Sequence, residues 1–412
     1  QYENLLHGRS GIKQIERNVA GRVVDSKVID PSIPGQDVYL NIDIDLQIKA
    51  ESLLGDTRGV IALIDVTDGS VISLVSTPSF DPNWFVDGIS VKQYDELKNN
   101  EDLPLFDRST KGLYPPGSTI KPMVALAGLE QKNITIKHTT FCPGFYKLSN
   151  YSRKFNDWKR TGHGSVDTIE AIAQSCDVFF YDLAYKMGID QIHESLSLFQ
   201  FGKKTGIDIP GELGGILPSR EWKKLNKDEP WYRGETLITG IGQGFMTASP
   251  MQLALATGAI ANKGQLYTPR VLMHTQSKNG ESYLESQVQS KQIPIKDISN
   301  WDLIEKAMRQ TVYGKLGTAK RLNNKLSYTL AGKTGTAQVF GLDPEEKYIA
   351  DNIDEKLRDH ALFTGYAPIE NPKVAIAIIV ENAGSGSSKA APLARSLLDE
   401  YFIKNPVDSE KL

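Results

Sequence analysis

The alternation of apolar and polar residues predicts a β-hairpin early in the chain. Residues 59–76 (GVIALIDVTDGSVISLVS) form two apolar runs around Asp68 and Gly69, a dipeptide that favours a tight turn between antiparallel strands. Just before them, residues 41–54 place leucines and isoleucines at helical spacing, after polar residues that can cap a helix. We therefore expect a helix that is followed by two paired strands.

Three further apolar segments, near the other end of the chain, also predict strands. They cover residues 328–340, 361–368 and 373–382, and an amphipathic helix is expected after them over about 391–402. Residues 118–265, between the two strand-rich regions, carry mainly helical patterns. Because strands come from both ends of the chain, the sequence predicts an α+β fold: a five-stranded, mixed or mainly antiparallel sheet flanked by helices.

The ends of the chain differ from this central region. Residues 1–38 are polar and rich in turns, which indicates an extended arm or the remainder of a neighbouring domain. Residues 39–405 hold the predicted sheet and helices, and residues 406–412 form a short tail. No apolar run reaches the ~18 residues of a membrane helix. The chain begins at Gln1, within sequence that already looks structured, so we expect a fragment, which leaves an N-terminal anchor before it open.

Composition and charge narrow the possible classes of protein. Of the 412 residues, 40% are hydrophobic and 24% are charged, so the chain can bury a substantial core and is not disordered. Lys and Arg total 47 against 50 Asp and Glu, a net charge of −3, whereas a nucleic-acid-binding protein would carry a basic face. Two cysteines are too few for a disulfide scaffold.

A candidate nucleophile lies at a predicted helix start within YPPGSTIKP (114–122). Two prolines and Gly117 interrupt the chain just before Ser118, and Lys121 follows three residues later on the same helix face. Free N–H groups at a helix start stabilise developing negative charge, and a lysine withdrawn from water loses its proton readily enough to act as a base. Ser-x-x-Lys alone is common, so the assignment needs support from other residues.

Two later motifs supply that support. Ser175 and Asp177 stand in SCD, at the end of a predicted helix, and Lys333, Thr334 and Gly335 lie in a predicted strand. Ser-x-x-Lys, Ser-x-Asn and Lys-Thr-Gly, in this order, mark penicillin-interacting serine acyl-transferases. Asp177 departs from the asparagine of most of these proteins, and an ionised aspartate can only accept hydrogen bonds.

Each of these residues has an expected role. Ser175 and Asp177 relay protons and orient the helix lysine, while Lys333 pairs with a substrate carboxylate. The glycine after it lets the substrate backbone approach the strand edge. The backbone N–H groups of Ser118 and Thr336 form the oxyanion hole.

Over nearly its whole length the chain resembles the transpeptidase region of the class B penicillin-binding proteins. The resemblance is greatest to the penicillin-binding protein 2 subfamily of the Gram-negative elongation machinery, in which Ser-x-Asp is the usual form, so Asp177 fits. Besides YPPGSTIKP and AGKTGTAQVFG, the segments that carry the resemblance are ENLLHG, GRVV, VSTPSFDPNWFVDGIS, KRTGHGSVD, SCDVFFYDLAYKMGI, GIGQGFMTASPMQLA and RDHALFTGYAP.

The resemblance implies that Ser118 is acylated by the D-Ala-D-Ala end of a peptidoglycan stem peptide. The last D-alanine leaves, and the acyl group passes to an amine of a neighbouring peptide, which cross-links the wall during cell elongation. β-Lactam antibiotics are implied as covalent inhibitors. The implied location is the periplasmic face of the bacterial inner membrane, with a glycan polymerase and cell-shape scaffold proteins as partners. Residues 1–38 are then the remainder of a pedestal domain.

Two other functions share the acylation step. A D,D-carboxypeptidase or β-lactamase passes the acyl group to water, and a β-lactam sensor keeps it in order to signal. The motifs alone do not separate these functions from transpeptidation. We find no Glu-x-x-Asn-type segment placed to argue for a deacylating water.

The two cysteines share a segment with other possible metal ligands. Cys142, Asp157, His163 and Cys176 follow the pattern C-x14-D-x5-H-x12-C, and all three residue types bind zinc. The spacing differs from common zinc fingers. A Cys142–Cys176 disulfide, two buried thiols and an ordinary loop histidine are the alternatives.

The resemblance favours zinc, because some members of the subfamily hold this ion beside the active site with an acidic residue, an aspartate, a histidine and a cysteine. Asp157, His163 and Cys176 match the last three ligands, and Cys142 takes the place of the first. With four protein ligands the zinc is expected to be structural rather than catalytic. Because Cys176 lies between Ser175 and Asp177, a metal bound to it would fix the loop that presents both of these side chains.

The remaining conspicuous residues receive structural interpretations. GIGQG (240–244) lacks the lysine and Ser or Thr of a phosphate-binding loop, which favours a turn. Asp107 and Arg108, about ten residues before Ser118, are assigned structural roles only. Five aromatic residues are candidates for a substrate groove but more often pack in the interior: Tyr146, Tyr151, Trp158, Trp231 and Tyr232.

Overall fold

A five-stranded antiparallel sheet lies at the centre of the computed structural model, which describes residues 1–149, 153–278, 280, 283–339 and 353–407. The strands run in the order β14-β15-β16-β4-β5, and their bounds are β4 (Gly59–Asp65), β5 (Val71–Thr77), β14 (Ala331–Ala337), β15 (His360–Ala367) and β16 (Val374–Val380). The predicted fold class and strand number are confirmed. β14 is shorter than the strand predicted over 328–340, and residue 340 of that predicted range lies outside the described residues.

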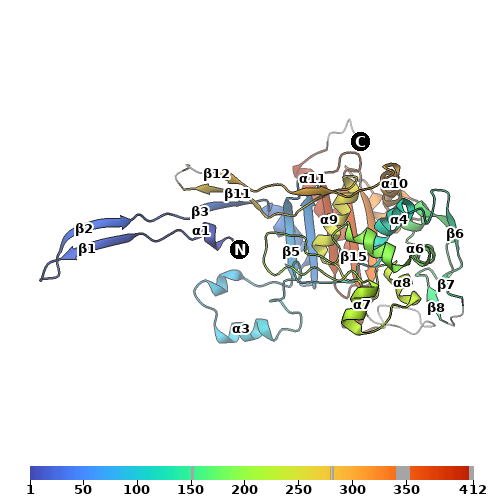
Figure 1. Cartoon of the computed structure of the whole chain (residues 1–412), viewed down its shortest axis with the longest axis horizontal. Coiled ribbons are helices and arrows are strands. Elements are labelled where there is room, and N and C mark those ends of the chain that lie inside the picture. Colours follow the sequence, from blue (N-terminus) through green and yellow to red (C-terminus); the bar gives the residue numbers. More distant parts are fainter. Residues whose placement is uncertain (150–152, 279, 281–282, 340–352, 408–412) are drawn as a thin grey trace.

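Both faces of the sheet are covered by helices (Figure 1). Along β4, Ile61 and Leu63 join a core with α2 (Ile44–Leu54) and α11 (Ala390–Lys404), whereas Ala62 and Ile64 join the opposite core, which contains α9 (Pro250–Ala261). Side chains of a strand alternate between faces, so a strand buried on both faces appears as a continuous apolar run.

The nucleophile side of the molecule is mainly helical. Its principal helices are α4 (Lys121–Glu130), α5 (Thr168–Ala173), α6 (Asp177–Ser197), α8 (Arg233–Thr239) and α10 (Ser299–Tyr313). The sequence did not reveal two small antiparallel two-stranded sheets here, β6 (Thr139–Cys142) with β9 (Gly164–Asp167) and β7 (Phe145–Lys147) with β8 (Lys154–Asn156). Strands of three or four residues are too short for a period-two pattern to stand out.

The N-terminal residues form an arm that extends from this body (Figure 1). β1 (Ile12–Arg17) and β2 (Val23–Asp30) pair as a hairpin with exposed side chains. β3 (Gln36–Leu40) then pairs with β11 (Leu272–Ser277) of the main domain, and β11 also pairs with β12 (Tyr283–Glu285). β3 spans the predicted boundary at 38/39. This boundary and the one at 405/406 stay predictions.

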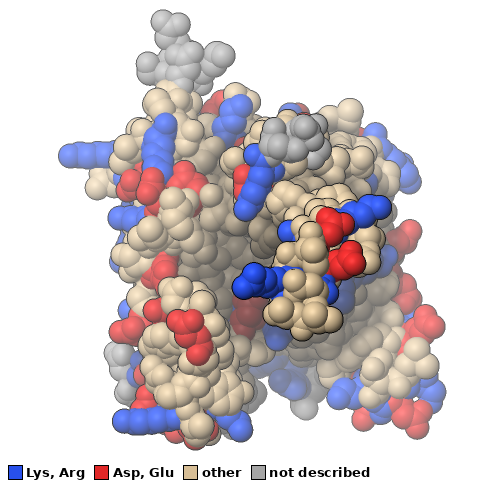
Figure 2. Space-filling view, turned by 90° about the vertical axis from the view of Figure 1, so that its left-hand side faces the viewer, with Lys and Arg blue, Asp and Glu red and all other residues tan. Residues whose placement is uncertain are grey.

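Two surface properties complete the description. Figure 2 views the molecule from the arm end, where acidic and basic side chains are interspersed. Within the described ranges, no helix combines the length and the apolar character that a membrane span requires. The remaining elements are α1 (Glu3–Leu6), η1 (Pro82–Phe85), α3 (Val91–Lys98), η2 (Gly117–Ile120), α7 (Arg220–Lys227), β10 (Gln265–Tyr267), β13 (Ser290–Gln292), η3 (Lys320–Asn323) and η5 (Glu355–Leu357).

Candidate active site

Ser118 lies in the short helix η2, which leads directly into α4, as the sequence predicted. Ser118 is half-buried. Gly117 adopts φ +54°, a conformation that favours glycine, and its N–H donates to the Gly242 carbonyl at 2.8 Å. The Thr119 hydroxyl donates to the Pro116 carbonyl at 2.6 Å, which closes the turn around the serine.

Lys121 is fully buried one helical turn after Ser118. Its ammonium donates to the Asp177 carboxylate (Oδ1) at 2.6 Å, to the Ser175 carbonyl at 2.9 Å and to the Ser175 hydroxyl at 3.3 Å. Ser175 adopts φ +61° in the connection between α5 and α6, and this unusual backbone conformation directs both its polar groups to the lysine. The structure thus brings the Ser-x-x-Lys and Ser-x-Asp motifs together.

Asp177 has a second partner that the sequence did not reveal. Its other carboxylate oxygen accepts the backbone N–H of Trp158 at 2.9 Å. The residue Trp158 is 58% exposed, and its indole N–H donates to the Gln174 carbonyl at 3.1 Å. Because Asp177 accepts on both oxygens, its orientation towards Lys121 is fixed from two sides.

Lys333 lies on β14, the edge strand nearest η2. The residue is fully buried, and its ammonium donates to the Thr334 carbonyl at 2.9 Å, so the predicted pairing with a substrate carboxylate stays a prediction. Burial, and then the nearby Lys121 cation, lower the pKa of Lys333 well below its ordinary value, while Asp177 opposes the shift. The Thr334 hydroxyl bonds the Thr318 hydroxyl at 2.7 Å.

The strand β14 and the turn of η2 lie in direct backbone contact. A Cβ atom on Gly117 would lie 2.5 Å from the Thr336 carbonyl oxygen, and one on Gly335 would lie 2.8 Å from the methyl group of Thr119. On the other side, a Cβ on Gly386 would lie 2.2 Å from the Gly335 carbonyl oxygen. The close approach that the sequence assigned to a substrate is therefore also required by the protein itself.

The GIGQG segment is a turn, as predicted, but it also belongs to the site. Gly242, with φ +74°, accepts the Gly117 N–H through its carbonyl, and the Gln243 side-chain amide donates to the Thr336 carbonyl at 2.9 Å. The segment thus holds η2 and β14 together. The only signal for this role in the sequence was its place among the segments of the family resemblance.

The candidate groove aromatics have diverse surroundings. Tyr146 packs on Tyr181, and the Trp231 indole donates to the Thr236 hydroxyl at 2.8 Å. Tyr232 is exposed, and Lys223 lies over its ring. Tyr151 lies outside the described residues. Their role in binding a substrate stays a prediction.

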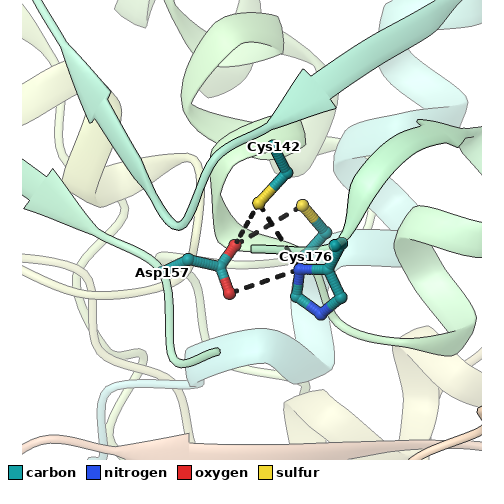
Figure 3. A group of neighbouring side chains, drawn as sticks. Cys142, Asp157 and Cys176 are labelled. Atoms are coloured by element: carbon teal, nitrogen blue, oxygen red, sulfur yellow. Dashed lines mark hydrogen bonds and ion pairs between the residues drawn. The ribbon is translucent and has the colours of Figure 1, made fainter. Parts of the chain in front are cut away.

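The four predicted metal ligands come together beside this site. Their ligand atoms all lie within 4.8 Å of one another, and Figure 3 shows the thiols of Cys142 and Cys176 and the carboxylate of Asp157 pointing towards one another. Each thiol sulfur is 3.4 Å from Asp157 Oδ2, and His163 Nδ1 is 3.4 Å from Asp157 Oδ1 and 3.5 Å from the Cys142 sulfur. Both cysteines are free, which excludes the disulfide in this structure.

These separations suit a tetrahedral zinc site. Zn–S bonds near 2.3 Å and Zn–N or Zn–O bonds near 2.0–2.1 Å place neighbouring ligand atoms roughly 3.3–3.8 Å apart. Burial would raise the pKa of Asp157, but hydrogen bonds from His163 and from the Lys159 N–H outweigh it and lower the pKa to about 2. Burial raises the pKa of both thiols, so a cation is needed to hold them as thiolates. The donor set therefore fits zinc.

Comparison with known proteins identifies two matching domain families and several relatives. Residues 59–399 match the penicillin binding protein transpeptidase domain, and residues 1–40 match the penicillin-binding protein dimerisation domain. The peptidoglycan D,D-transpeptidase MrdA of Haemophilus influenzae is 41% identical over 410 residues, which are 100% of this chain and 63% of that protein. The chain thus spans less than two thirds of the length of this relative.

Two solved structures are also similar. Penicillin-binding protein 2 of Pseudomonas aeruginosa, in complex with WCK 5153, is 43% identical with a TM-score of 0.83, covering 92% of this chain and 82% of that one. The same protein of Helicobacter pylori, in complex with MreC, is 32% identical with a TM-score of 0.87, covering 98% and 71%. With its fold, its ordered motifs and these matches, the chain belongs to the penicillin-binding protein transpeptidase family.

Proposed function

We propose that this chain carries the D,D-transpeptidase activity of a class B penicillin-binding protein and cross-links peptidoglycan stem peptides through an acyl-enzyme on Ser118. The observation that carries the proposal is the position of the Lys121 ammonium, buried between Ser175 and Asp177 one helical turn from the serine. A purely structural role for Lys121 would require neither a serine at the helix start nor a second buried lysine on β14, the edge strand that contacts η2. A serine acyl-transferase requires all three residues.

In the first step the Ser118 hydroxyl oxygen attacks the carbonyl carbon between the two D-alanines. Lys121, after its ammonium has given up one proton, takes the hydroxyl proton, the N–H groups of Ser118 and Thr336 bind the oxyanion, and the C–N bond then breaks. The proton passes, through Ser175, to the departing D-alanine amine. Asp177 holds the lysine in place and pairs with the ammonium that forms.

In the second step the amine of a neighbouring stem peptide attacks the ester carbon. Lys121 accepts a proton from this amine and returns it to the Ser118 oxygen as the amide bond forms, so the enzyme is regenerated. Lys333 is proposed to pair with the terminal carboxylate of the donor. Since burial lowers the pKa of Lys333, an arriving carboxylate would favour its charged form.

Mass spectrometry after treatment with penicillin tests this function. We expect a stable adduct of one penicillin per chain, located on the peptide that contains Ser118. An adduct that is lost within seconds as penicilloate would favour the β-lactamase-type alternative, and rapid release of D-alanine to water without cross-linking would favour the carboxypeptidase. No adduct at all would contradict the proposed function.

We further propose that Cys142, Asp157, His163 and Cys176 hold one structural zinc ion. Zinc would supply a positive charge that keeps both thiols deprotonated and ties three chain segments together. Two of these ligands are adjacent in sequence to active-site groups, because Trp158 follows Asp157 and Asp177 follows Cys176. The orientation of Asp177 thus depends on how firmly the segments around Asp157 and Cys176 are held.

Protein purified without added metal is expected to contain about one zinc per chain by elemental analysis. Removal of the metal with a chelator should lower the free energy of unfolding by about 3 kcal/mol or more, the effect of a ligand at 100 or more times its Kd. Cys142→Ala should lose the metal, whereas Ser26→Ala in the arm should retain it. Metal-free protein with a Cys142–Cys176 disulfide would contradict the proposal.

The proposed setting is the periplasmic face of the bacterial inner membrane. The family resemblance supports a membrane anchor outside residues 1–412 and a glycan polymerase as a partner. The Helicobacter pylori relative was solved as a complex with MreC, which supports a cell-shape scaffold protein as a second partner. β-Lactam antibiotics are the proposed covalent inhibitors.

A further inference from the structure

Tyr114 is fixed at three points, four residues before the nucleophile. Its backbone N–H donates to the Ala248 carbonyl at 3.0 Å, and its carbonyl accepts the Ala248 N–H at 2.9 Å. Its hydroxyl donates to Glu381 Oε1 at 2.7 Å, just beyond the end of β16. The residue is buried, and burial raises its pKa, so the hydroxyl remains a hydrogen-bond donor.

Glu381 is itself held by two arginines. The Arg108 side chain is buried and donates through Nε to Glu381 Oε1 at 2.9 Å, while Arg58 Nε lies 3.6 Å from Oε2. Arg108 also donates to the carbonyls of Asp102 and Leu103. A carboxylate that pairs with one buried and one mostly buried guanidinium group has little freedom to move. The tyrosine hydroxyl is therefore anchored to a fixed point at the end of the central sheet.

The chain between Tyr114 and Ser118 can absorb little displacement. Pro115 and Pro116 have φ fixed by their rings. Gly117 is bonded through its N–H to Gly242 and faces the Thr336 carbonyl, where a Cβ would lie 2.5 Å away. A shift of the tyrosine backbone would therefore be transmitted to the serine rather than lost in a flexible link.

We infer that Tyr114, anchored through Glu381 and Arg108, is a positioning residue that sets the location of the Ser118 hydroxyl relative to Lys121. This inference rests on the proposed acylation of Ser118. It gives a function to Arg108, which the sequence alone assigned only a structural role. A misplacement of about 1 Å, even by a group that never touches the substrate, can cost about 100-fold in rate.

Tyr114→Phe tests the inference, because it removes only the anchoring hydroxyl. Tyr328→Phe is the matched control. Tyr328 is equally buried, and its hydroxyl donates to the Asp399 carboxylate at 2.8 Å, but it packs with α11 on the other face of the sheet. Stopped-flow reaction with a fluorescent penicillin separates the affinity of the non-covalent complex from the acylation rate constant. Thermal unfolding gives the stability of both variants.

We expect Tyr114→Phe to lower the acylation rate constant by about 10- to 100-fold. The affinity of the non-covalent complex should stay within twofold of the unchanged protein. Tyr328→Phe should keep the full rate constant at a comparable loss of thermal stability. If Tyr114→Phe does not fold, Glu381→Gln replaces it, because it removes the charge opposite Arg108 with little change of shape.

Equal losses in both phenylalanine variants, or an unchanged rate constant in Tyr114→Phe, would overturn the inference, since the hydroxyl would then contribute only stability or nothing. These outcomes are distinct from failure of the proposed function. In that case the unchanged protein itself would not be acylated.

Discussion

Penicillin no longer labels the protein when Ser118 is replaced by alanine, and the fold is retained: this is the first result that we expect. The serine supplies the only oxygen that the proposed reaction acylates. Among the residues that the structure describes, its hydroxyl has no hydrogen-bond partner, so its removal should change the free energy of unfolding by about 0.5 kcal/mol or less. Intact-protein mass spectrometry measures the label, and thermal unfolding measures the fold.

Ser26→Ala, an exposed serine of the arm, is the control and should be labelled like the unchanged protein. A penicillin adduct that persists in the Ser118→Ala variant would place the nucleophile elsewhere. Loss of the label together with a large loss of stability would leave the role of the serine in the chemistry unsupported.

Lys121→Ala should lower the second-order rate constant of acylation by about 100- to 10,000-fold, the usual contribution of a general base. It should also destabilise the fold by about 3–5 kcal/mol, because it breaks a buried ion pair and leaves Asp177 without its cation. The rate constant must therefore be measured at a temperature where the variant is folded, with circular dichroism as the check.

Lys121→Arg separates the two effects. Arginine retains a cation opposite Asp177, but it stays protonated in proteins and cannot accept the serine proton. We expect it to keep more stability than alanine and yet to acylate almost as slowly. An arginine variant with a rate constant within tenfold of the unchanged protein would show that the lysine acts through its charge and not as a base.

Much of the fold could be predicted because its strands are short, apolar and bounded by turn residues. The pattern around Asp68 and Gly69 identified the β4–β5 hairpin, and Gly69 does adopt φ +80°. β14 also lay within its predicted range. The strand pairs β6–β9 and β7–β8 escaped detection, because they depend on contacts with α5 and α6 rather than on a local pattern of their own.

The structure brings Lys121, Ser175 and Asp177 of the predicted motifs together, but the sequence predicted only part of their geometry. Ordered motifs identify Lys121 and Lys333, whereas the complete burial of both depends on how β14 packs against η2. The link from Trp158 to Asp177 uses a backbone N–H, which any residue type offers, so no residue letter signals it. The contact between Gln243 and Thr336 could not be predicted either, because it joins segments 93 residues apart.

Under the proposed transpeptidase function, the crowding around Gly335 has a consequence for the evolution of resistance to β-lactams. A transpeptidase escapes β-lactams through substitutions that slow its reaction with the drug more than its reaction with the natural peptide. Gly335 cannot gain a side chain without meeting Thr119, and Gly386 cannot gain one without meeting Gly335, so this strand has little room for adaptive change. Escape is instead expected at neighbours with exposed side chains, of which Trp158 is an example because it contacts Asp177 only through its backbone.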